Sequence, residues 1–258
     1  MRSVLEVTEV VEETPSTVTL RFPHPMSAEP GQFVMIWLPG DDELPMSLSY
    51  TEGLSKGVTI KAMGESTRRS LRLRPGAKVG IRGPYGNHFD LTPPRILIVG
   101  GGSGTAVLAP AAERALAQGA RVTVALGATR APELLFKERL RTAGARVVVA
   151  TDDGSEGARG FVTGVTESLL EADRFDAIWT CGPEVMMRKV AALAAPRGVP
   201  VFCSIERHMK CALGMCDACA IGPYHVCVDG PVFPAEKVLA TPDFGSFHRD
   251  SSGRRRPL

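Results

Sequence analysis

Four cysteines lie close together near the C-terminal end of the chain, and they constrain its folding more than any other feature. Cys211, Cys216, Cys219 and Cys227 have the spacing C-x4-C-x2-C-x7-C. The region around them, from about residue 201 onward, is rich in Cys, Gly and Pro and has little hydrophobic periodicity. We therefore expect bonds to sulfur, rather than a core of its own, to order this region. A disulfide framework, a structural zinc site and an iron-sulfur cluster all compete for such a spacing.

The rest of the chain favours metal or redox chemistry over disulfides. The N-terminal residues alternate like a strand, and no apolar stretch approaches the ~18 residues of a membrane span. We expect a cytoplasmic protein, and the reducing thiol pool of that compartment disfavours structural disulfides. Thirty basic and 28 acidic residues leave a net charge of +2, which predicts no general attraction to nucleic acid or membranes. The basic C-terminal "GRRRPL" is expected to be a frayed, solvated tail.

The pattern along the chain predicts three regions. Residues 1–93 contain short β-rich runs separated by Pro, Gly and acidic residues, which indicates an antiparallel β-barrel or sandwich. In residues 94–200, apolar strands at 95–100, 121–127, 146–151, 175–182 and 199–205 alternate with helix-patterned segments. This alternation predicts a parallel sheet covered by helices on both faces. Residues 201–258 are the cysteine-rich segment and tail. The predicted fold class is thus a β-barrel plus an α/β domain.

A glycine-rich turn follows the first predicted parallel strand. In "ILIVGGGSGTAV", Gly101, Gly102 and Gly104 would let the backbone approach a pyrophosphate at the N-terminus of the next helix. Thr105 stands where the last glycine of G-x-G-x-x-G is expected, and the turn could also be a plain strand-to-helix connection. Two more polar loops, one containing Asp152 and one reading "CGP", also follow parallel strands. That edge of a parallel sheet is where such folds bind ligands.

The order of these motifs resembles a known superfamily. A small β-domain, then a strand, "GGGSG" and a helix, then a strand ending in "CGP" are similar to the ferredoxin-NADP reductase superfamily. The resemblance implies a barrel that binds FAD and a second domain that binds NAD(P). More specifically, "TDDGSEGARGFVT", "CGPEVMM", "SIERHMKCALGMCDACAIG" and "CVDGPVF" resemble the electron-transfer subunits of type B dihydroorotate dehydrogenases, over about residues 4–240.

For the four clustered cysteines, the resemblance implies that all of them bind one [2Fe-2S] cluster. The C-x4-C-x2-C spacing with a later cysteine is also that of plant-type ferredoxins, in which the backbone wraps the cluster and donates N–H groups to its sulfurs. Small residues stand between the ligands: Ala212, Gly214, Ala218 and Ala220. Zinc is the alternative, but zinc sites usually have two C-x2-C pairs, and only Cys216 and Cys219 form one.

The two remaining cysteines suggest different roles. Cys203 lies in an apolar strand and is expected to be an inert buried thiol. By resemblance, Cys181 would lie beside the nicotinamide at the hydride-transfer site, with Gly182 and Pro183 next to the cofactor. A buried structural thiol is the alternative for Cys181.

In the barrel, the resemblance implies FAD contacts from these residues: Pro45, Met46, Ser47, Thr59, Ile60, Lys61, Ser66 and Thr67. Leu44 stands where relatives have an arginine that pairs with the pyrophosphate, so a charge-assisted contact is missing. Lys61 could replace the charge, although not the bidentate fork of an arginine. Tyr50 could stack on the isoalloxazine ring, or it could be a partly buried strand aromatic.

These features together predict an electron-transfer subunit. A nicotinamide exchanges a hydride and an iron-sulfur cluster passes single electrons, so a flavin must stand between them. The chain has no candidate orotate site, and a (β/α)8 barrel would need about 250 residues by itself. The resemblance therefore implies a partner, a catalytic FMN-containing dihydroorotate dehydrogenase subunit, in a heterotetramer with two copies of each chain. Electrons would pass through the cluster and FAD to NAD+ in pyrimidine biosynthesis. The sequence leaves NADP open, because no acidic residue ends the second parallel strand and Arg130 follows it.

Two alternatives share part of this pattern. The small flavin and iron-sulfur subunit of a ferredoxin-NADP transhydrogenase or of a sulfhydrogenase has a similar layout. A zinc-stabilised regulator that binds a nucleotide without redox chemistry belongs to a different class. Flavin and cluster absorbance bands would separate the electron-transfer proteins from the colourless zinc regulator.

Overall fold

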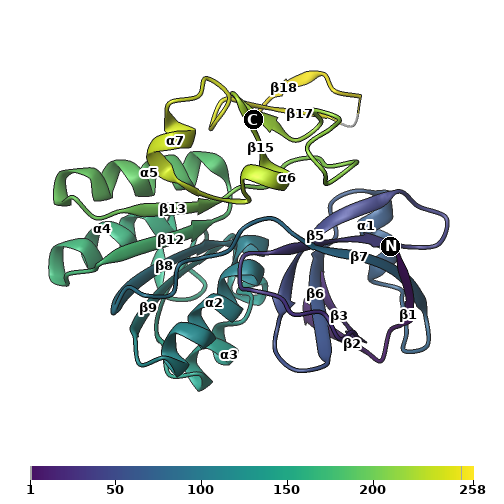
Figure 1. Ribbon diagram of the computed structural model, residues 1–258. Coiled ribbons are helices and arrows are strands. Elements are labelled where there is room, and N and C mark those ends of the chain that lie inside the picture. The colour runs from purple at the N-terminus through teal and green to yellow at the C-terminus, as the bar shows by residue number, and fades with distance from the viewer. Residues whose placement is uncertain (1, 251) are drawn as a thin grey trace.

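A computed structural model describes residues 2–250 and 252–258 and contains two seven-stranded sheets (Figure 1). The N-terminal sheet, purple to blue in Figure 1, curls into a barrel, and the second sheet, teal to green, is covered by helices. The C-terminal segment, in yellow, lies above the groove between them. This arrangement confirms the predicted fold class. Among the described residues, no helix has the length and apolar character needed to cross a membrane.

The barrel sheet is antiparallel, with the strand order β1-β7-β4-β5-β6-β3-β2. Its strands are β1 (Ser3–Glu6), β2 (Glu9–Thr14), β3 (Thr17–Pro23), β4 (Phe33–Trp37), β5 (Glu43–Tyr50), β6 (Ser55–Lys61) and β7 (Lys78–Tyr85). The short helix α1 (Glu65–Ser70) follows β6. Successive side chains of a strand point to opposite faces, so Leu20, Ile36, Ile60 and Ile81 fill the barrel interior while their neighbours face outward.

The second sheet has the order β11-β10-β9-β8-β12-β13-β16, and its strands are parallel up to β13. The strands are β8 (Arg95–Gly101), β9 (Arg121–Ala128), β10 (Arg146–Thr151), β11 (Ala158–Arg159), β12 (Ala177–Cys181) and β13 (Val201–Ser204). The helices are η1 (Gly102–Gly104), α2 (Thr105–Ala117), η2 (Ala131–Glu133), α3 (Lys137–Thr142), α4 (Val162–Ala172), α5 (Glu184–Ala194) and η3 (Ala195–Arg197). Helices α2 and α3 cover one face and α4 and α5 the other, as predicted.

The C-terminal segment is attached to the second sheet. Its elements are β14 (Ala220–Ile221), β15 (Tyr224–His225), α6 (Val226–Asp229), β16 (Val232–Pro234), α7 (Ala235–Leu239), β17 (Phe247–Arg249) and β18 (Arg255–Pro257). Strand β16 pairs antiparallel with β13 at the sheet edge. The segment packs into the second domain instead of forming a separate core: Met209, Ile221, Phe233 and Phe244 are buried in the core beneath α4 and α5, and this packing helps to order the segment. Their spacing is too irregular to show a period in the sequence.

The tail also differs from its expected frayed state. Strands β17 and β18 form an antiparallel hairpin. Arg256 Nε bonds Asp250 at 2.8 Å, and the Arg255 guanidinium lies 4.6 Å from the centre of the Phe247 ring. The N–H of Leu258 donates to the carbonyl of Ser246 at 3.1 Å. Three consecutive arginines between a glycine and a proline give no strand signal in the sequence.

Tyr50 fastens the barrel to the second domain. Its ring lies 3.8 Å from the guanidinium groups of both Arg21 and Arg139, which therefore cover its two faces. Arg139 also bonds Glu113 at 2.7 Å and the Ser49 carbonyl at 2.9 Å. The ring has no free face for an isoalloxazine, so the second interpretation, a partly buried strand aromatic, describes Tyr50. The contact thus joins β5 of the barrel to α3 of the second domain.

Candidate functional site

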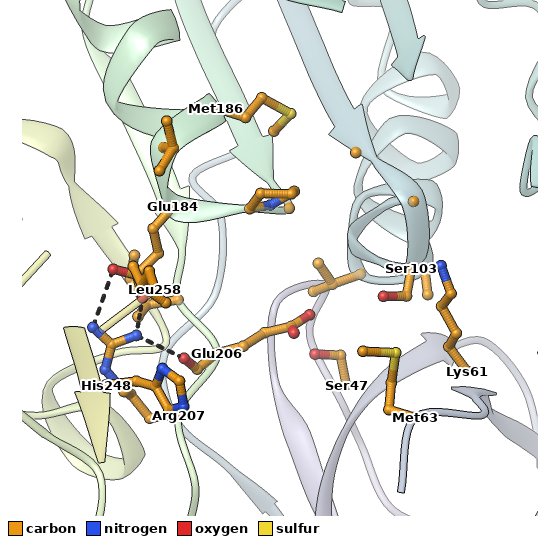
Figure 2. A pocket seen from close by; sticks show the side chains of 18 of the residues that line it. Ser47, Lys61, Met63, Ser103, Glu184, Met186, Glu206, Arg207, His248 and Leu258 are labelled. Carbon is orange, nitrogen blue, oxygen red and sulfur yellow. Dashed lines mark hydrogen bonds and ion pairs between the residues drawn. The ribbon is translucent and has the colours of Figure 1, made fainter. Parts of the chain in front are cut away.

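A cavity of about 1060 Å³ lies between the barrel, the second sheet and the C-terminal segment (Figure 2). Pockets for a single ligand commonly have about 300–1,000 Å³, so this one lies at the upper end of that range. Its walls come from β5 and β6 of the barrel, from the carboxyl ends of β8, β9, β10 and β12, and from the tail hairpin.

Most of the predicted cofactor residues line this cavity. They are Pro45, Met46, Ser47, Thr59, Lys61, Thr67, Gly101, Gly102, Asp152, Gly182 and Pro183. Five predicted residues lie outside its wall: Ile60, Ser66, Gly104, Thr105 and Cys181. Ile60 points into the barrel core between Thr59 and Lys61, and Ser66 donates to Asp41 at 3.1 Å. A cofactor contact by these five remains a prediction.

Lys61 lies at the junction of the barrel and the glycine turn. Its Nζ is 3.9 Å from the position that a Cβ on Gly102 would occupy, and Figure 2 shows it pointing toward the turn beside Ser103. Leu44, at the position of the missing arginine, also lines the cavity. The cationic group of this wall therefore faces the glycine turn, where N–H groups at the start of α2 favour an anion.

The glycine turn packs directly against the CGP loop. A Cβ on Gly104 would overlap the carbonyl of Cys181, so only glycine fits there. Gly182 has φ +149°, and a Cβ on it would lie 3.0 Å from the Cα of Gly101. Because β8 and β12 are neighbours in the sheet, their two loops form a continuous floor of backbone on which a flat or phosphate-bearing ligand can rest closely.

Glu206 is the acidic group at the centre of the cavity. It follows β13, and its carboxylate points across the cavity toward Ser47 (Figure 2). The side chain of Glu206 is exposed within the open cavity, but the protein around it displaces much of its water, and this desolvation raises the pKa of Glu206 toward the protonated form. The Cys181 Sγ lies 4.0 Å from Glu206 Oε1. Burial, together with this carboxylate, raises the pKa of Cys181 well above its ordinary value, so the group is a neutral thiol rather than a thiolate.

A buried ion pair supports the backbone beside Glu206. Arg207 bonds the Glu184 carboxylate, and its Nη1 donates to the Glu206 carbonyl at 3.0 Å. Glu184 also accepts the N–H of Gly245 at 2.6 Å. Burial lowers the pKa of Arg207 to about 10, which still leaves it charged at neutral pH. The pair ties together α5, the segment that precedes the cysteines, and the tail.

The opposite end of the cavity lies beyond β9 and β10. Asp152 and the exposed ring of Phe161 line it there, together with Glu133. Glu133 accepts a hydrogen bond from Ser16 Oγ at 2.6 Å. Arg130, which left NADP open in the sequence, lies 3.6 Å from Glu133 and does not line the cavity. Two carboxylates thus face this end, an arrangement that suits ribose hydroxyls and repels an added phosphate.

The four clustered cysteines lie near one another. Cys216 is close enough to influence the pKa of Cys211, and Cys227 and Cys216 are close enough to influence that of Cys219. The N–H groups of Leu213 and Met215 donate to Cys211 Sγ at 3.3 and 3.4 Å, and that of Gly214 donates to Cys227 Sγ at 3.3 Å. Burial opposes ionisation of Cys211, but these N–H groups prevail and lower its pKa to about 6.

This donor set fits an iron-sulfur cluster. Four thiols and inward-pointing N–H groups match the ligands and the sulfur hydrogen bonds that such a cluster needs. The described residues include no group of three or more His, Cys, Asp or Glu side chains placed to hold one metal ion, so the fit to a cluster rests on the four thiols and on these N–H groups. Cys203 is buried in β13, where burial raises its pKa to about 12, in keeping with an inert thiol.

Three polar residues near the site escaped the sequence analysis: Arg82, Glu206 and Arg207. Glu206 could have been found, because it lies two residues beyond the end of parallel strand β13, at the carboxyl edge where ligands bind. Arg207 and Arg82 gave no such signal, because their partners Glu184 and Glu43 are distant in the sequence.

Comparisons with known proteins agree with this geometry. Residues 206–239 match the family described as the iron-sulfur cluster binding domain of dihydroorotate dehydrogenase B. A relative from Methanocaldococcus jannaschii, named a probable dihydroorotate dehydrogenase B (NAD(+)) electron transfer subunit, is 39% identical over 254 residues. The match covers 98% of this chain and 97% of the relative. A protein of the same name from Methanothermobacter thermautotrophicus is 43% identical over 261 residues, with 98% and 97% covered.

Among solved structures, the chain is similar to one from an NADH-dependent reduced ferredoxin-NADP oxidoreductase that performs flavin-based electron bifurcation. The two superpose with a TM-score of 0.83 at 29% sequence identity, over 91% of this chain and 89% of that one. A cytochrome P450 reductase from Amycolatopsis is similar at 25% identity, with a TM-score of 0.67 over 77% of this chain and 67% of the other.

Proposed function

The chain belongs to the family of dihydroorotate dehydrogenase B electron transfer subunits, and from this membership we propose that it carries electrons from a catalytic dihydroorotate dehydrogenase subunit through a [2Fe-2S] cluster and FAD to NAD+. Passage of electrons through an iron-sulfur centre and a flavin is common to the family. The cluster type, FAD as the flavin and NAD+ as the acceptor are the parts that we propose.

One observation supports this proposal above the others, namely that the cysteine loop adjoins the cavity. Met209 lines the cavity, and Cys211 follows it after one residue. A redox centre held by the cysteines would therefore lie next to a flavin in the cavity. When bound, the flavin exchanges a hydride with a nicotinamide and single electrons with the cluster.

The flavin site that we propose uses the barrel wall. Pro45, Met46 and Ser47 on β5 and Thr59 on β6 would contact FAD, with Thr67 of α1 beyond them. Thr67 Oγ1 accepts N–H bonds from Met63 and Gly64 at 2.9 Å, which holds the turn before α1 in place. With Leu44 at the arginine position, the pyrophosphate depends on backbone N–H groups rather than on a charged fork.

The nicotinamide nucleotide would lie on the floor of Gly101, Gly102, Gly182 and Pro183. Cys181, beneath that floor, supports the floor as a neutral thiol. Glu206, with its raised pKa, can hold a proton in the cavity and donate a hydrogen bond toward Ser47 or a cofactor. Asp152 and Glu133 at the far end favour a free ribose hydroxyl, which supports NAD over NADP.

For the partner, we propose an FMN-containing catalytic subunit in a heterotetramer with two copies of each chain. Leu213 and Met215 in the cysteine loop, and Val228 in α6, are more than half exposed. Large apolar side chains gathered around a redox loop are suited to being covered by a protein partner.

The fold is shared with the bifurcating oxidoreductase, so a transhydrogenase role is the neighbouring alternative. The higher identity and the nearly complete coverage of the dihydroorotate dehydrogenase relatives favour the proposed role.

Reconstitution tests the proposal. We expect the purified chain to contain flavin and iron, to reduce artificial acceptors with NADH, and to leave dihydroorotate unoxidised. Addition of the FMN subunit from the same source should create dihydroorotate-dependent NAD+ reduction. Absence of that activity, in a mixture where the two chains are shown to bind, would contradict the proposed function.

A further inference from the structure

Arg82 joins the barrel to the cysteine loop. It lies on β7, and its side chain leaves the barrel toward residues 210 and 211. Its Nη1 donates to the carbonyl of Cys211 at 2.9 Å, and its Nη2 donates to the carbonyl of Lys210 at 3.1 Å. Its Nε donates to Glu43 at 2.7 Å. The guanidinium therefore bonds two elements that are far apart in the sequence.

The contacts of Arg82 are largely shielded from solvent, unlike those of a salt bridge on the surface. The side chains of Arg82 and Glu43 are only 17% and 14% exposed. Tyr85 Oη lies 3.1 Å from Nη1, and Arg2 bonds the other oxygen of Glu43 at 2.6 Å. A planar fork with donors on all three nitrogens makes these contacts at once, and a lysine cannot reproduce them.

The contacts of Arg82 connect the cavity wall on β5 with the cysteine loop. Glu43 begins β5, whose next residues Pro45, Met46 and Ser47 line the cavity. Cys211 is the first clustered cysteine, and its Sγ accepts the N–H bonds of Leu213 and Met215. Fixing the Cys211 carbonyl fixes the peptide that leads into those N–H groups. The contact therefore sets how the loop lies against the cavity wall.

We propose that Arg82 is a positioning residue for the cluster, holding the Cys211 segment against the flavin wall and raising the reduction potential of the cluster with its fixed charge. The inference rests on the proposed [2Fe-2S] site. Reduction of a cluster adds a negative charge, which a nearby guanidinium in a partly buried place stabilises. Partners that orient metal ligands typically change metal retention 10–100-fold when they are replaced.

Two substitutions in the full chain separate charge from geometry. Arg82→Met removes both, and Arg82→Lys keeps only the charge. Lys78→Met is the matched control, because Lys78 lies on the same strand and pairs with Glu6 at 2.8 Å on the exposed surface, away from the loop. The readouts are the cluster midpoint potential from a redox titration followed by electron paramagnetic resonance, the rate of iron release to a chelator, and the flavin content.

We expect Arg82→Met to lower the midpoint potential and to release iron roughly tenfold faster or more. Arg82→Lys should release iron almost as fast but keep most of the potential. Lys78→Met should match the parent chain, and all three variants should retain flavin. An unchanged potential and iron-release rate in Arg82→Met overturns the inference, as does an equal change in Lys78→Met or a loss of flavin from Arg82→Met. A parent chain without any cluster overturns the proposed function instead.

Discussion

At the scale of single residues, Cys219 offers a sharp test of the cluster site. It is 2% exposed, and burial raises its pKa to about 12, so a free Cys219 would stay a protonated thiol at neutral pH. Binding to iron would remove that proton, because a metal ligand must be a thiolate. We expect Cys219→Ser to lose most of its iron and to keep its flavin, with both measured on one sample. Cys203→Ala is the control, since Cys203 is equally buried but lies in β13, and it should keep both. Full iron retention in Cys219→Ser would show that this cysteine is not a ligand.

Lys61 is the second residue whose position makes a prediction. Its Nζ faces the glycine turn near Gly102, so we expect it to bind a phosphate of the nicotinamide nucleotide. Loss of a hydrogen bond to a charged group costs about 1.5–3 kcal/mol, so Lys61→Met should raise the KM for NADH by roughly 10–100-fold while kcat with an artificial acceptor changes little. If Lys61 serves FAD instead, Lys61→Met will lose flavin, and Leu44→Arg in the same chain will restore it. Fluorimetric titration of the flavin-free protein distinguishes the two results.

At the scale of secondary-structure elements, prediction from the sequence succeeded where the pattern was local. Strands β8, β9 and β10 could be placed to within a residue, because each is a continuous apolar run between turns. The tail could not be placed, because contacts from distant residues hold it: Arg188 donates to the Phe244 carbonyl at 2.6 Å, and Glu184 accepts the N–H of Gly245. In the site, alternation along β6 points Ile60 into the barrel core while Thr59 and Lys61 line the cavity, so a cofactor contact by Ile60 stays a prediction.

The link between α5 and the segment before the cysteines gives the prediction at this scale. Glu184 and Arg207 are 7% and 3% exposed, and removal of one partner from a buried pair leaves an unpaired charge. Such changes cost about 3–5 kcal/mol, so Glu184→Gln should lower the free energy of unfolding by that order and lower the melting temperature clearly. Asp176→Asn is the control, since its pair with Arg95 is largely exposed and should be worth less than about 1 kcal/mol. Equal melting temperatures of Glu184→Gln and the parent chain, by circular dichroism, would contradict the structural role.

At the scale of the whole molecule, the sites follow one another in a fixed order. The floor of Gly101 and Gly182 lies on one side of the cavity, the flavin wall of β5 on the other, and the cysteine loop begins beyond Met209. In the proposed function, hydride exchange between nicotinamide and flavin would need only the cavity, whereas electrons from the partner would enter at the cysteines.

This order predicts an asymmetric loss of activity when the cluster is removed. In the complex with the FMN subunit, Cys219→Ser should abolish dihydroorotate-dependent NAD+ reduction, because the entry route for electrons is interrupted. The same variant should still reduce an artificial acceptor with NADH at close to the parent rate, because Cys219 does not line the cavity. Both rates should be measured on one preparation, with circular dichroism and gel filtration showing that the fold and the complex are intact, and Cys203→Ala should keep both activities. If an intact Cys219→Ser complex lost both activities to the same extent, the cluster would lie between nicotinamide and flavin, and the order nicotinamide, flavin, cluster, partner would be wrong.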